Sequence, residues 1–123
     1  MPSARRRGYA PVVFDDAAFD EDMKRLSASA AEVARQARSR YEAAGVPVAD
    51  LRGCAEESND ETTLPRCLKV YLPEPAGRFG MVFRLIVHPS RSRLRYLAFG
   101  VRHHPGDSHA PTVYQLAHKR LHR

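Results

Sequence analysis

The N-terminal part of the chain contains a short β-rich run followed by residues that suit a helix. Tyr9–Phe14 is rich in β-forming side chains, but Pro11 interrupts it, which is typical of an edge strand. Asp15 or Asp16 can then cap a helix, because a carboxylate accepts hydrogen bonds from the N–H groups of the first turn. We predict that this helix runs to about Leu26.

A second helix is predicted from apolar residues that recur at helical spacing. Ser27 or Ser29 is its expected cap, and Gly45 followed by Pro47 is its expected end. Together the two helices predict a helical hairpin. The apolar stripe of the second helix comprises Ala30, Val33, Ala34, Ala37, Tyr41 and Ala44.

The period of the pattern changes in the second half of the chain. Residues 50–65 are polar, acidic and irregular, which indicates a loop. Residues 66–72 then alternate between apolar and polar side chains, as a strand does. Residues 79–88 are largely apolar and predict a central strand, and residues 93–101 predict a third. Three consecutive strands with turn residues between them predict an antiparallel meander.

The chain ends with one more helical pattern. Residues 102–111 indicate a loop, and Thr112 is the expected cap of a helix over residues 113–122. The order is edge strand, helical hairpin, three-stranded antiparallel meander and C-terminal helix, which predicts an α+β fold. The buried stripe of the last helix comprises Val113, Leu116, Ala117 and Leu121.

Length and composition are those of one domain. The chain has 123 residues, of which 43% are hydrophobic, enough to bury a core. We assign residues 9–123 to this domain and expect residues 1–8 to form a disordered basic arm. We expect no membrane segment and no signal peptide, because no apolar run approaches ~20 residues. Cys54 and Cys67 form no CxxC pair, so we expect free thiols in a reducing cytoplasm.

The charge of the chain is unevenly distributed. The formal net charge is +6, but residues 1–61 contain 9 basic and 12 acidic side chains. Residues 62–123 contain 11 basic and 2 acidic side chains, together with all six histidines. Such asymmetry suggests a polyanionic partner, with nucleic acid as the first candidate and an acidic substrate or a membrane surface as the next.

The basic half places its candidate residues where a meander can gather them on one side of the sheet. A single arginine is most often a solvated surface charge. For the group, the near absence of acidic partners favours an anionic ligand instead. Lys69 shares a strand face with Tyr71, and the strands, turns and last helix that follow supply Arg78, Arg84, Arg102 and Tyr114.

Aromatic residues are interleaved with these cations. Exposed rings stack on the bases of single-stranded RNA, whereas buried rings fill a core. We expect Phe83 and Phe99 to be core residues, and Tyr71 and Tyr114 to be the more exposed ones.

The histidines raise the possibility of a metal site. His118 and His122 have i, i+4 spacing, but Asp107 is the only carboxylate in this region and no metalloprotease motif is present. Phosphate-binding and dinucleotide-binding glycine motifs are also missing from the sequence. We therefore expect neither a metal nor a cofactor.

Three segments of the chain form a recognisable set, namely RCLKVYL, RFGMVFRLIV and the ending LAFGVRHH…TVYQLAHKRL. They resemble the RelE/ParE superfamily of bacterial toxins, and more closely the RelE-like ribosome-dependent mRNA interferases. VVFDDAAFDEDMKRL and LRGC also fit, more loosely, so the resemblance spans nearly the whole chain. It implies a RelE-like fold for residues 9–123 and the function of a type II toxin that cleaves mRNA on the ribosome.

The resemblance also implies roles for single residues. Lys69 matches the first catalytic lysine of the family, Arg102 the arginine at the end of the last strand, and Tyr114 the tyrosine that opens the terminal helix. Arg78 is the fourth expected catalytic residue. Four further residues are expected to bind RNA, namely Tyr71, Arg84, Lys119 and Arg120.

Two positions depart from the family pattern. The second lysine of the family falls on Tyr71, and the arginine of the next strand falls on Gly80. Arg78 or Arg84 would then have to supply the missing charge. The loop over residues 102–111 is also longer than is usual in the family.

The implied reaction is metal-free attack of a 2′-OH on the adjacent phosphorus. It needs a base, cations around the phosphorane and an acid for the leaving oxygen. The expected partners are an antitoxin protein, mRNA and the ribosome. Two alternatives remain open: a ParE-like poison of DNA gyrase, and a non-catalytic nucleic-acid-binding protein of the same fold.

Overall fold

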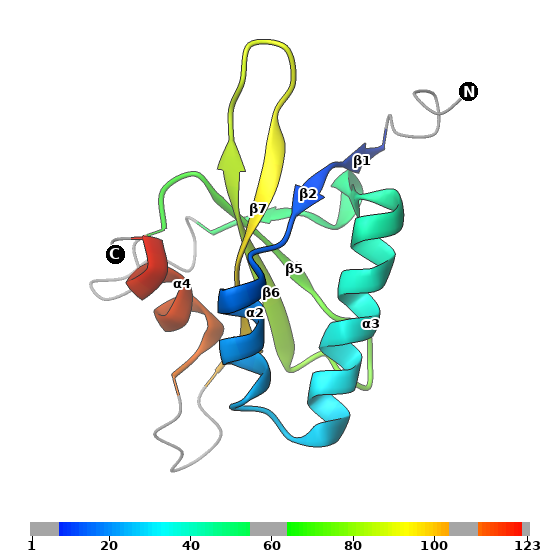
Figure 1. Ribbon diagram of the computed structural model, residues 1–123, viewed down its shortest axis with the longest axis vertical. Helices are drawn as coiled ribbons and strands as arrows, with labels where there is room; N and C mark the ends of the chain where they lie inside the picture. The colour runs from blue at the N-terminus through cyan, green and yellow to red at the C-terminus, as the bar shows by residue number, and fades with distance from the viewer. Residues whose placement is uncertain (1–7, 55–63, 104–110, 122–123) are drawn as a thin grey trace.

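The computed structural model describes residues 8–54, 64–103 and 111–121, and within them the chain is an α+β protein with three α-helices and two sheets (Figure 1). The expected arm, apart from Gly8, and most of the loop over residues 102–111 lie outside the described residues. The elements are β1 (Tyr9–Ala10), β2 (Val12–Val13), α2 (Asp16–Met23), α3 (Ala28–Ala44), β3 (Val46–Pro47), the 3-10 helix η1 (Val48–Asp50), β4 (Arg52–Gly53), β5 (Cys67–Tyr71), β6 (Phe79–Ile86), β7 (Arg93–Val101) and α4 (Val113–Leu121).

The main sheet has the strand order β2-β7-β6-β5-β4. Its centre is the antiparallel meander β5-β6-β7, as the sequence predicts. The expectation of a loop throughout residues 50–65 is wrong, because β4 pairs with the outer edge of β5. Two-residue strands are too short to show a hydrophobic period, so the pattern could not indicate β4.

The N-terminal run divides at Pro11, as expected of a residue that lacks a backbone N–H. Before Pro11, β1 pairs antiparallel with β3. After it, β2 pairs parallel with β7 and is an edge strand of the main sheet. The edge assignment of Tyr9–Phe14 is therefore confirmed, although it comprises two short strands that join two different sheets.

Both helices of the hairpin begin at a predicted cap. Asp15 Oδ1 accepts a hydrogen bond from the N–H of Ala18 at 3.1 Å. Ser27 Oγ accepts one from the N–H of Ala30 at 3.2 Å. The first helix ends at Met23, about one turn earlier than the sequence predicts.

Gly45 ends the second helix as predicted. Its φ is +87°, a conformation that favours glycine, and its N–H donates to the carbonyl oxygen of Tyr41 at 2.7 Å. A Cβ at this position would lie 2.8 Å from the carbonyl oxygen of Ala10. Of the predicted stripe, Ala44 is exposed, and Ala31 is buried instead.

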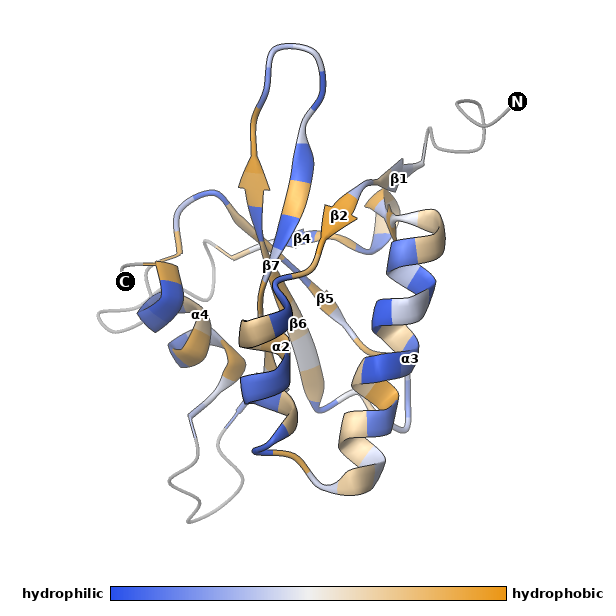
Figure 2. Ribbon diagram, viewed as in Figure 1, coloured by the Kyte–Doolittle hydropathy of each residue, from blue (hydrophilic) through white to orange (hydrophobic). Residues whose placement is uncertain are grey.

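Helices cover both faces of the main sheet. One core lies between the sheet and the pair α2 and α3, which run in opposite directions on the same face (Figure 1). The second core lies between the sheet and α4, on the other face. In Figure 2, hydrophilic and hydrophobic residues are interspersed along α2 and α3, as expected of helices with one face on a sheet.

The last helix begins with a reciprocal cap. Thr112 Oγ1 accepts a hydrogen bond from the N–H of Gln115 at 3.2 Å, and Gln115 Oε1 accepts one from the N–H of Thr112 at 2.9 Å. The helix continues to Leu121, and the predicted last residue, His122, lies outside the described residues. In the described part of the chain, no helix has the length and apolar character required to cross a bilayer.

Candidate nucleic-acid interface

Four of the predicted residues meet on the α4 side of the main sheet. Lys69 and Tyr71 project from one face of β5, Arg102 directly follows β7, and Tyr114 is in the first turn of α4. We call these four residues the cation–tyrosine cluster. Three segments far apart in the sequence therefore contribute to one place in the fold.

Lys69 lies between the two tyrosines of the cluster. Its Nζ is 5.4 Å from the ring centroid of Tyr71 and 5.2 Å from that of Tyr114. The guanidinium carbon of Arg102 lies 3.7 Å from the Tyr71 centroid, so the two planar groups are in direct contact. A cation over an aromatic face is attracted by the ring quadrupole, which fixes both cations relative to the rings.

The backbone also holds Arg102 in place. Its Nη1 donates to the carbonyl oxygen of Gly77 at 2.8 Å, and its backbone N–H donates to the carbonyl oxygen of Arg78 at 2.8 Å. Its Nε is buried and has no hydrogen-bond partner in the described residues. The Arg102 guanidinium is therefore oriented but not fully satisfied.

Gly80 leaves room for the Arg102 side chain. Gly80 is paired with Tyr71 on β5 and with Gly100 on β7. A Cβ on Gly80 would lie 3.3 Å from Cγ of Arg102, which is tighter than an ordinary contact. The glycine at this departure from the family pattern thus provides the space that Arg102 occupies.

The cluster differs in exposure from one residue to the next. Lys69 is 3% exposed and Tyr114 is 6% exposed, whereas Tyr71 and Arg102 are half-buried. The expectation that Tyr114 is among the more exposed aromatics is wrong, because its ring packs into the second core. Phe83 and Phe99 are core residues, as predicted.

Arg52 is a cation of this site that sequence reasoning did not identify. It lies on β4, and its guanidinium carbon is 5.5 Å from the Tyr71 centroid. No signal in the sequence could have indicated it, since its position depends on the unforeseen pairing of β4 with β5. In that register Arg52 lies directly opposite Lys69.

Three other predicted residues lie outside the cluster. Arg78 is exposed, and its guanidinium rests 4.9 Å from the ring centroid of Phe79. Arg84 is exposed further along β6, directly opposite Arg95 on β7. Lys119 is exposed on α4. These side chains are open to a ligand, but among the described residues none of the three makes a side-chain contact with the cluster.

Arg120 is engaged in the interior of the protein. Its side chain is 6% exposed and pairs with Asp22, which is fully buried, at 2.6 Å. It also pairs with Glu21 at 2.7 Å and donates to the carbonyl oxygen of Leu97 at 2.7 Å. The expectation that Arg120 binds RNA is therefore corrected, because its guanidinium joins α4 to α2 across the edge of β7.

Asp22 completes this buried network. Its Oδ2 accepts hydrogen bonds from the Tyr96 hydroxyl at 2.5 Å and from the N–H of Phe99 at 3.0 Å. Asp22 thus satisfies the N–H of Phe99, and Arg120 satisfies the carbonyl of Leu97. Both groups belong to the part of β7 that extends beyond its short pairing with β2. Asp22 is one of several acidic residues near the start of α2, and no local pattern distinguishes it from them, so sequence reasoning missed this role.

The network raises the pKa values of two of its members. Burial, and secondly the Asp22 carboxylate, raise the pKa of Tyr96 well above its usual value. For Arg120, burial opposes the charged form, but the hydrogen bonds with Asp22 and Glu21 outweigh it and raise the pKa. Both groups therefore keep their protons at neutral pH.

The two cysteines are buried and form no disulfide, as expected. Burial raises the pKa of the Cys67 thiol to about 11, although the nearby Arg84 acts in the opposite direction. Within residues 8–54, 64–103 and 111–121, no three His, Cys, Asp or Glu side chains come together in a group able to hold a metal.

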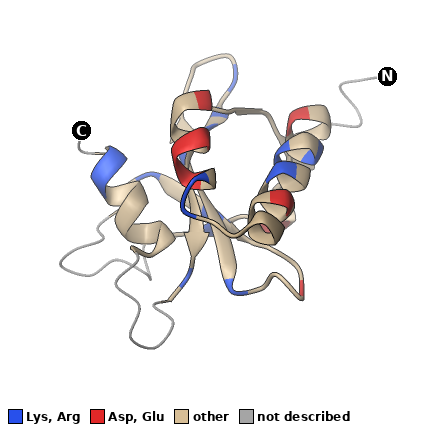
Figure 3. Cartoon of the chain, turned by 60° about the horizontal axis from the view of Figure 1, so that its bottom comes forward, with Lys and Arg blue, Asp and Glu red and all other residues tan. Residues whose placement is uncertain are grey.

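Acidic residues are concentrated on α2. Figure 3 shows acidic residues on α2 and residues of both signs on α3, whereas the α4 segment contains only basic charged residues. The fold and site thus define an α+β protein with a largely buried cation–tyrosine cluster at one end of its central strands. No protein-family model, curated protein or solved structure matches the chain.

Proposed function

We propose that this protein is a RelE-like toxin of a type II toxin–antitoxin system, an endoribonuclease that cleaves mRNA on the ribosome. The observation that carries the proposal is the convergence of Lys69, Tyr71, Arg102 and Tyr114 from three separate segments. Three of these residues are the ones that the family resemblance independently assigns to catalysis.

In the proposed mechanism, Arg102 holds the scissile phosphate. Its guanidinium is already oriented by Tyr71 and by the Gly77 carbonyl, so little conformational freedom is lost when the phosphate binds. Arg78 supplies a second, more mobile charge at the same end of β6. Both cations stabilise the extra negative charge of the phosphorane that forms as the 2′-OH attacks.

Proton transfer is assigned to Tyr114 and Lys69. One removes the proton of the attacking 2′-OH, and the other protonates the leaving 5′-oxygen. The ammonium of Lys69 lies 5.2 Å from the Tyr114 ring centroid, where it favours negative charge that develops on the phenol. No step in this mechanism requires a metal or a cofactor.

The departures at Tyr71 and Gly80 are compatible with this proposal. Tyr71 provides the ring on which Arg102 rests, and Gly80 leaves the space that its side chain crosses. Together they hold Arg102 in a defined orientation at the two positions where the family has cations.

The proposed partners follow from the charge. A cognate antitoxin would cover the basic surface with an acidic segment, and mRNA and the ribosome would occupy the surface when the antitoxin is absent. Translation takes place in the cytoplasm, which is where we propose that the protein acts.

One observation favours a second candidate function. The proposed proton-transfer residues, Lys69 and Tyr114, are both more than nine-tenths buried. Such burial suits a binding protein that cleaves nothing, either a ParE-like gyrase poison or a nucleic-acid-binding protein of the same fold.

Induction of the gene in a bacterial host separates these functions. We expect growth arrest with mRNAs cut within codons, and relief of the arrest by Arg102→Ala combined with Tyr114→Phe. Arg35→Ala, which removes an exposed charge from α3, serves as the control. Arrest that survives the double substitution, with intact mRNA and DNA damage signalling, would indicate gyrase poisoning. RNA binding without arrest would indicate a non-catalytic protein.

A further inference from the structure

The hairpin formed by β6 and β7 carries two arginines in direct opposition. Arg84 on β6 is the cross-strand partner of Arg95 on β7, and both are exposed. Like charges directly opposite each other in a sheet are destabilising. A pair of this kind is most readily explained by an anion that binds between the two guanidiniums.

Few carboxylates are available to neutralise this pair. Asp15 reaches Arg95 at 3.7 Å, in a partly exposed contact, and no described carboxylate forms an ion pair with Arg84. Arg91 and Arg93 extend the charge toward the hairpin tip and likewise have no ion pair among the described residues. We call Arg84, Arg91, Arg93 and Arg95 the arginine strip. The hairpin projects beyond the other elements, so the strip is accessible (Figure 1).

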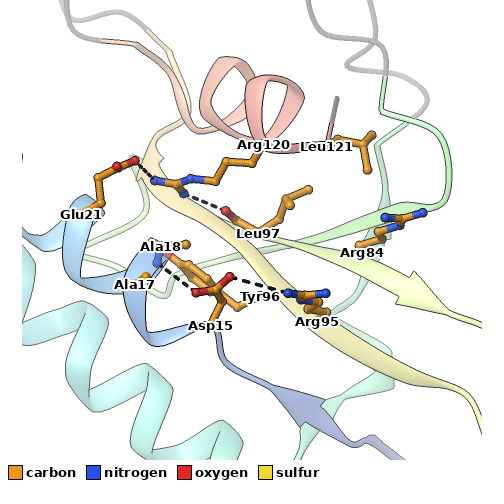
Figure 4. Close-up of a pocket in the computed structure, with 10 residues that line it drawn as sticks. All are labelled: Asp15, Ala17, Ala18, Glu21, Arg84, Arg95, Tyr96, Leu97, Arg120 and Leu121. Atoms are coloured by element: carbon orange, nitrogen blue, oxygen red, sulfur yellow. Dashed lines mark hydrogen bonds and ion pairs between the residues drawn. The ribbon is translucent and has the colours of Figure 1, made fainter. Parts of the chain in front are cut away.

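A pocket of about 350 Å³ opens beside the strip. Arg84 and Arg95 line it together with residues from α2 and α4, and Figure 4 shows both guanidiniums on the strands that form its floor. Arg120 also borders the pocket, but Glu21 and Asp22 already neutralise it. Asp15 also lines the pocket and contacts Arg95 at 3.7 Å, so Arg84 is the arginine of the pocket that has no ion pair among the described residues.

The strip is separate from the cation–tyrosine cluster but lies on the same two strands. Arg84 is four residues along β6 from Gly80, a distance of roughly 13 Å in an extended strand. Cys67, the β5 partner of Arg84, packs in the core beneath α4, which places Arg84 on the α4 side of the sheet. One extended chain of phosphates can therefore contact both places.

We infer that the Arg84–Arg95 pair is a second phosphate-binding site, which holds the RNA backbone at a distance from the proposed cleavage site. The aromatic residues of β6 and β7 are all buried, so the strip lacks the exposed aromatic anchors that protein interfaces usually have. Guanidinium forks match phosphate oxygens bidentately. RNA is therefore favoured over an acidic protein. The identity of the polyanion rests on the proposed function, but binding at the strip does not require cleavage.

The test compares two double variants of the full chain. Arg84→Gln with Arg95→Gln removes the pair, and Arg35→Gln with Arg40→Gln removes two exposed charges from α3 as a matched control. The probe is a fluorescent single-stranded RNA with 2′-O-methyl groups, which binds but cannot be cleaved. Its affinity is measured by anisotropy from 50 to 300 mM NaCl.

We expect the strip variant to bind roughly tenfold more weakly at 150 mM NaCl, and its salt slope to fall by about 0.7, because the pair holds one phosphate. Each phosphate neutralised on a single strand contributes about 0.7 to that slope. The control should bind within about twofold of the parent. Thermal stability of the strip variant should be unchanged or higher, because like-charge repulsion is relieved.

Two results would overturn the inference. One is an equal loss of affinity in the strip variant and the control. It would indicate that RNA responds only to the overall positive charge of the protein and not to the strip. The other is unchanged RNA binding with lost binding of a poly-glutamate peptide, which would assign the strip to an acidic protein. These results are distinguishable from failure of the proposed function. If the protein does not cleave RNA, unmodified RNA stays uncut, but the affinity for RNA still depends on the strip.

Discussion

Gly80 lies beneath the side chain of Arg102, so that a Cβ at position 80 would come within 3.3 Å of Arg102 Cγ. The same glycine is the cross-strand partner of Tyr71, whose ring supports the Arg102 guanidinium. The two residues that depart from the family pattern are thus neighbours that position one arginine. This relationship gives the proposed site its geometry and leads to the first two predictions.

Gly80→Ala should displace Arg102 without unfolding the protein. The added methyl also lies 3.4 Å from the carbonyl oxygen of Val70, so the arginine must give way. A displacement of about 1 Å at a catalytic group can reduce the rate on the order of 10²-fold, and because this contact requires a smaller shift we expect a loss of roughly tenfold in RNA cleavage. Gly100→Ala is the control, because its nearest neighbours would lie 3.6 Å away, an ordinary contact. Equal activity in the two variants would contradict the proposed role of Gly80.

Tyr71→Phe should keep most of the RNA affinity, whereas Tyr71→Leu should lose it. A phenylalanine retains the ring face on which Arg102 lies, and leucine does not. A cation–π contact contributes about 1–2 kcal/mol when partly desolvated, which corresponds to roughly tenfold in affinity. Anisotropy with the uncleavable RNA measures both variants. A large loss in the phenylalanine variant would show that the hydroxyl, and not the ring, is required.

Asp22→Ala should strongly destabilise the fold. It would leave Arg120 buried without its partner and remove the acceptor of the Phe99 N–H. Breaking one side of a buried ion pair costs about 3–5 kcal/mol of the free energy of unfolding. Urea denaturation measures this loss. Asp20→Ala, at an exposed position of the same helix, should change stability by no more than about 0.5 kcal/mol. Similar midpoints for both variants would refute the structural role of Asp22.

The free energy of unfolding should decrease as the pH rises from about 9 to 10. The pKa of Cys67 is raised to about 11 by burial, so between 9 and 11 the folded protein holds a proton that the unfolded chain releases. The slope from this group is at most about 1.4 kcal/mol per pH unit. The raised pKa values of Tyr41 and Tyr96 add to the decrease only above about pH 10.

Cys67→Ala isolates this contribution. The variant should lose most of the slope between pH 9 and 10 in urea denaturation experiments. An identical slope in parent and variant would show that another group titrates in this range.

The regular elements could be predicted from the sequence because their signals are local. Asp15, Ser27 and Thr112 cap helices through hydrogen bonds to N–H groups three residues away, and Gly45 ends α3 through its own φ. The alternation in β5 and the apolar run in β6 likewise lie within single segments. Hence the α+β class and the central meander follow from pattern alone.

The features that could not be predicted depend on contacts between segments that are distant in the sequence. Arg52 approaches Tyr71 only because β4 pairs with β5, and Arg120 is buried only because Asp22 lies beside it. The exposure of Tyr114 was misjudged for the same reason, since its ring enters a core formed by other elements. No periodicity within one segment contains this information.

The central claim is that the cation–tyrosine cluster cleaves RNA by attack of a 2′-OH. The most direct measurement combines purified protein, ribosomes and a short end-labelled mRNA, and analyses the ends of the fragments. The account predicts cleavage that leaves a 2′,3′-cyclic phosphate and disappears both in Arg102→Ala and when the attacking nucleotide is 2′-deoxy. An mRNA that stays intact with active ribosomes, or cleavage that persists with the 2′-deoxy nucleotide, would contradict it.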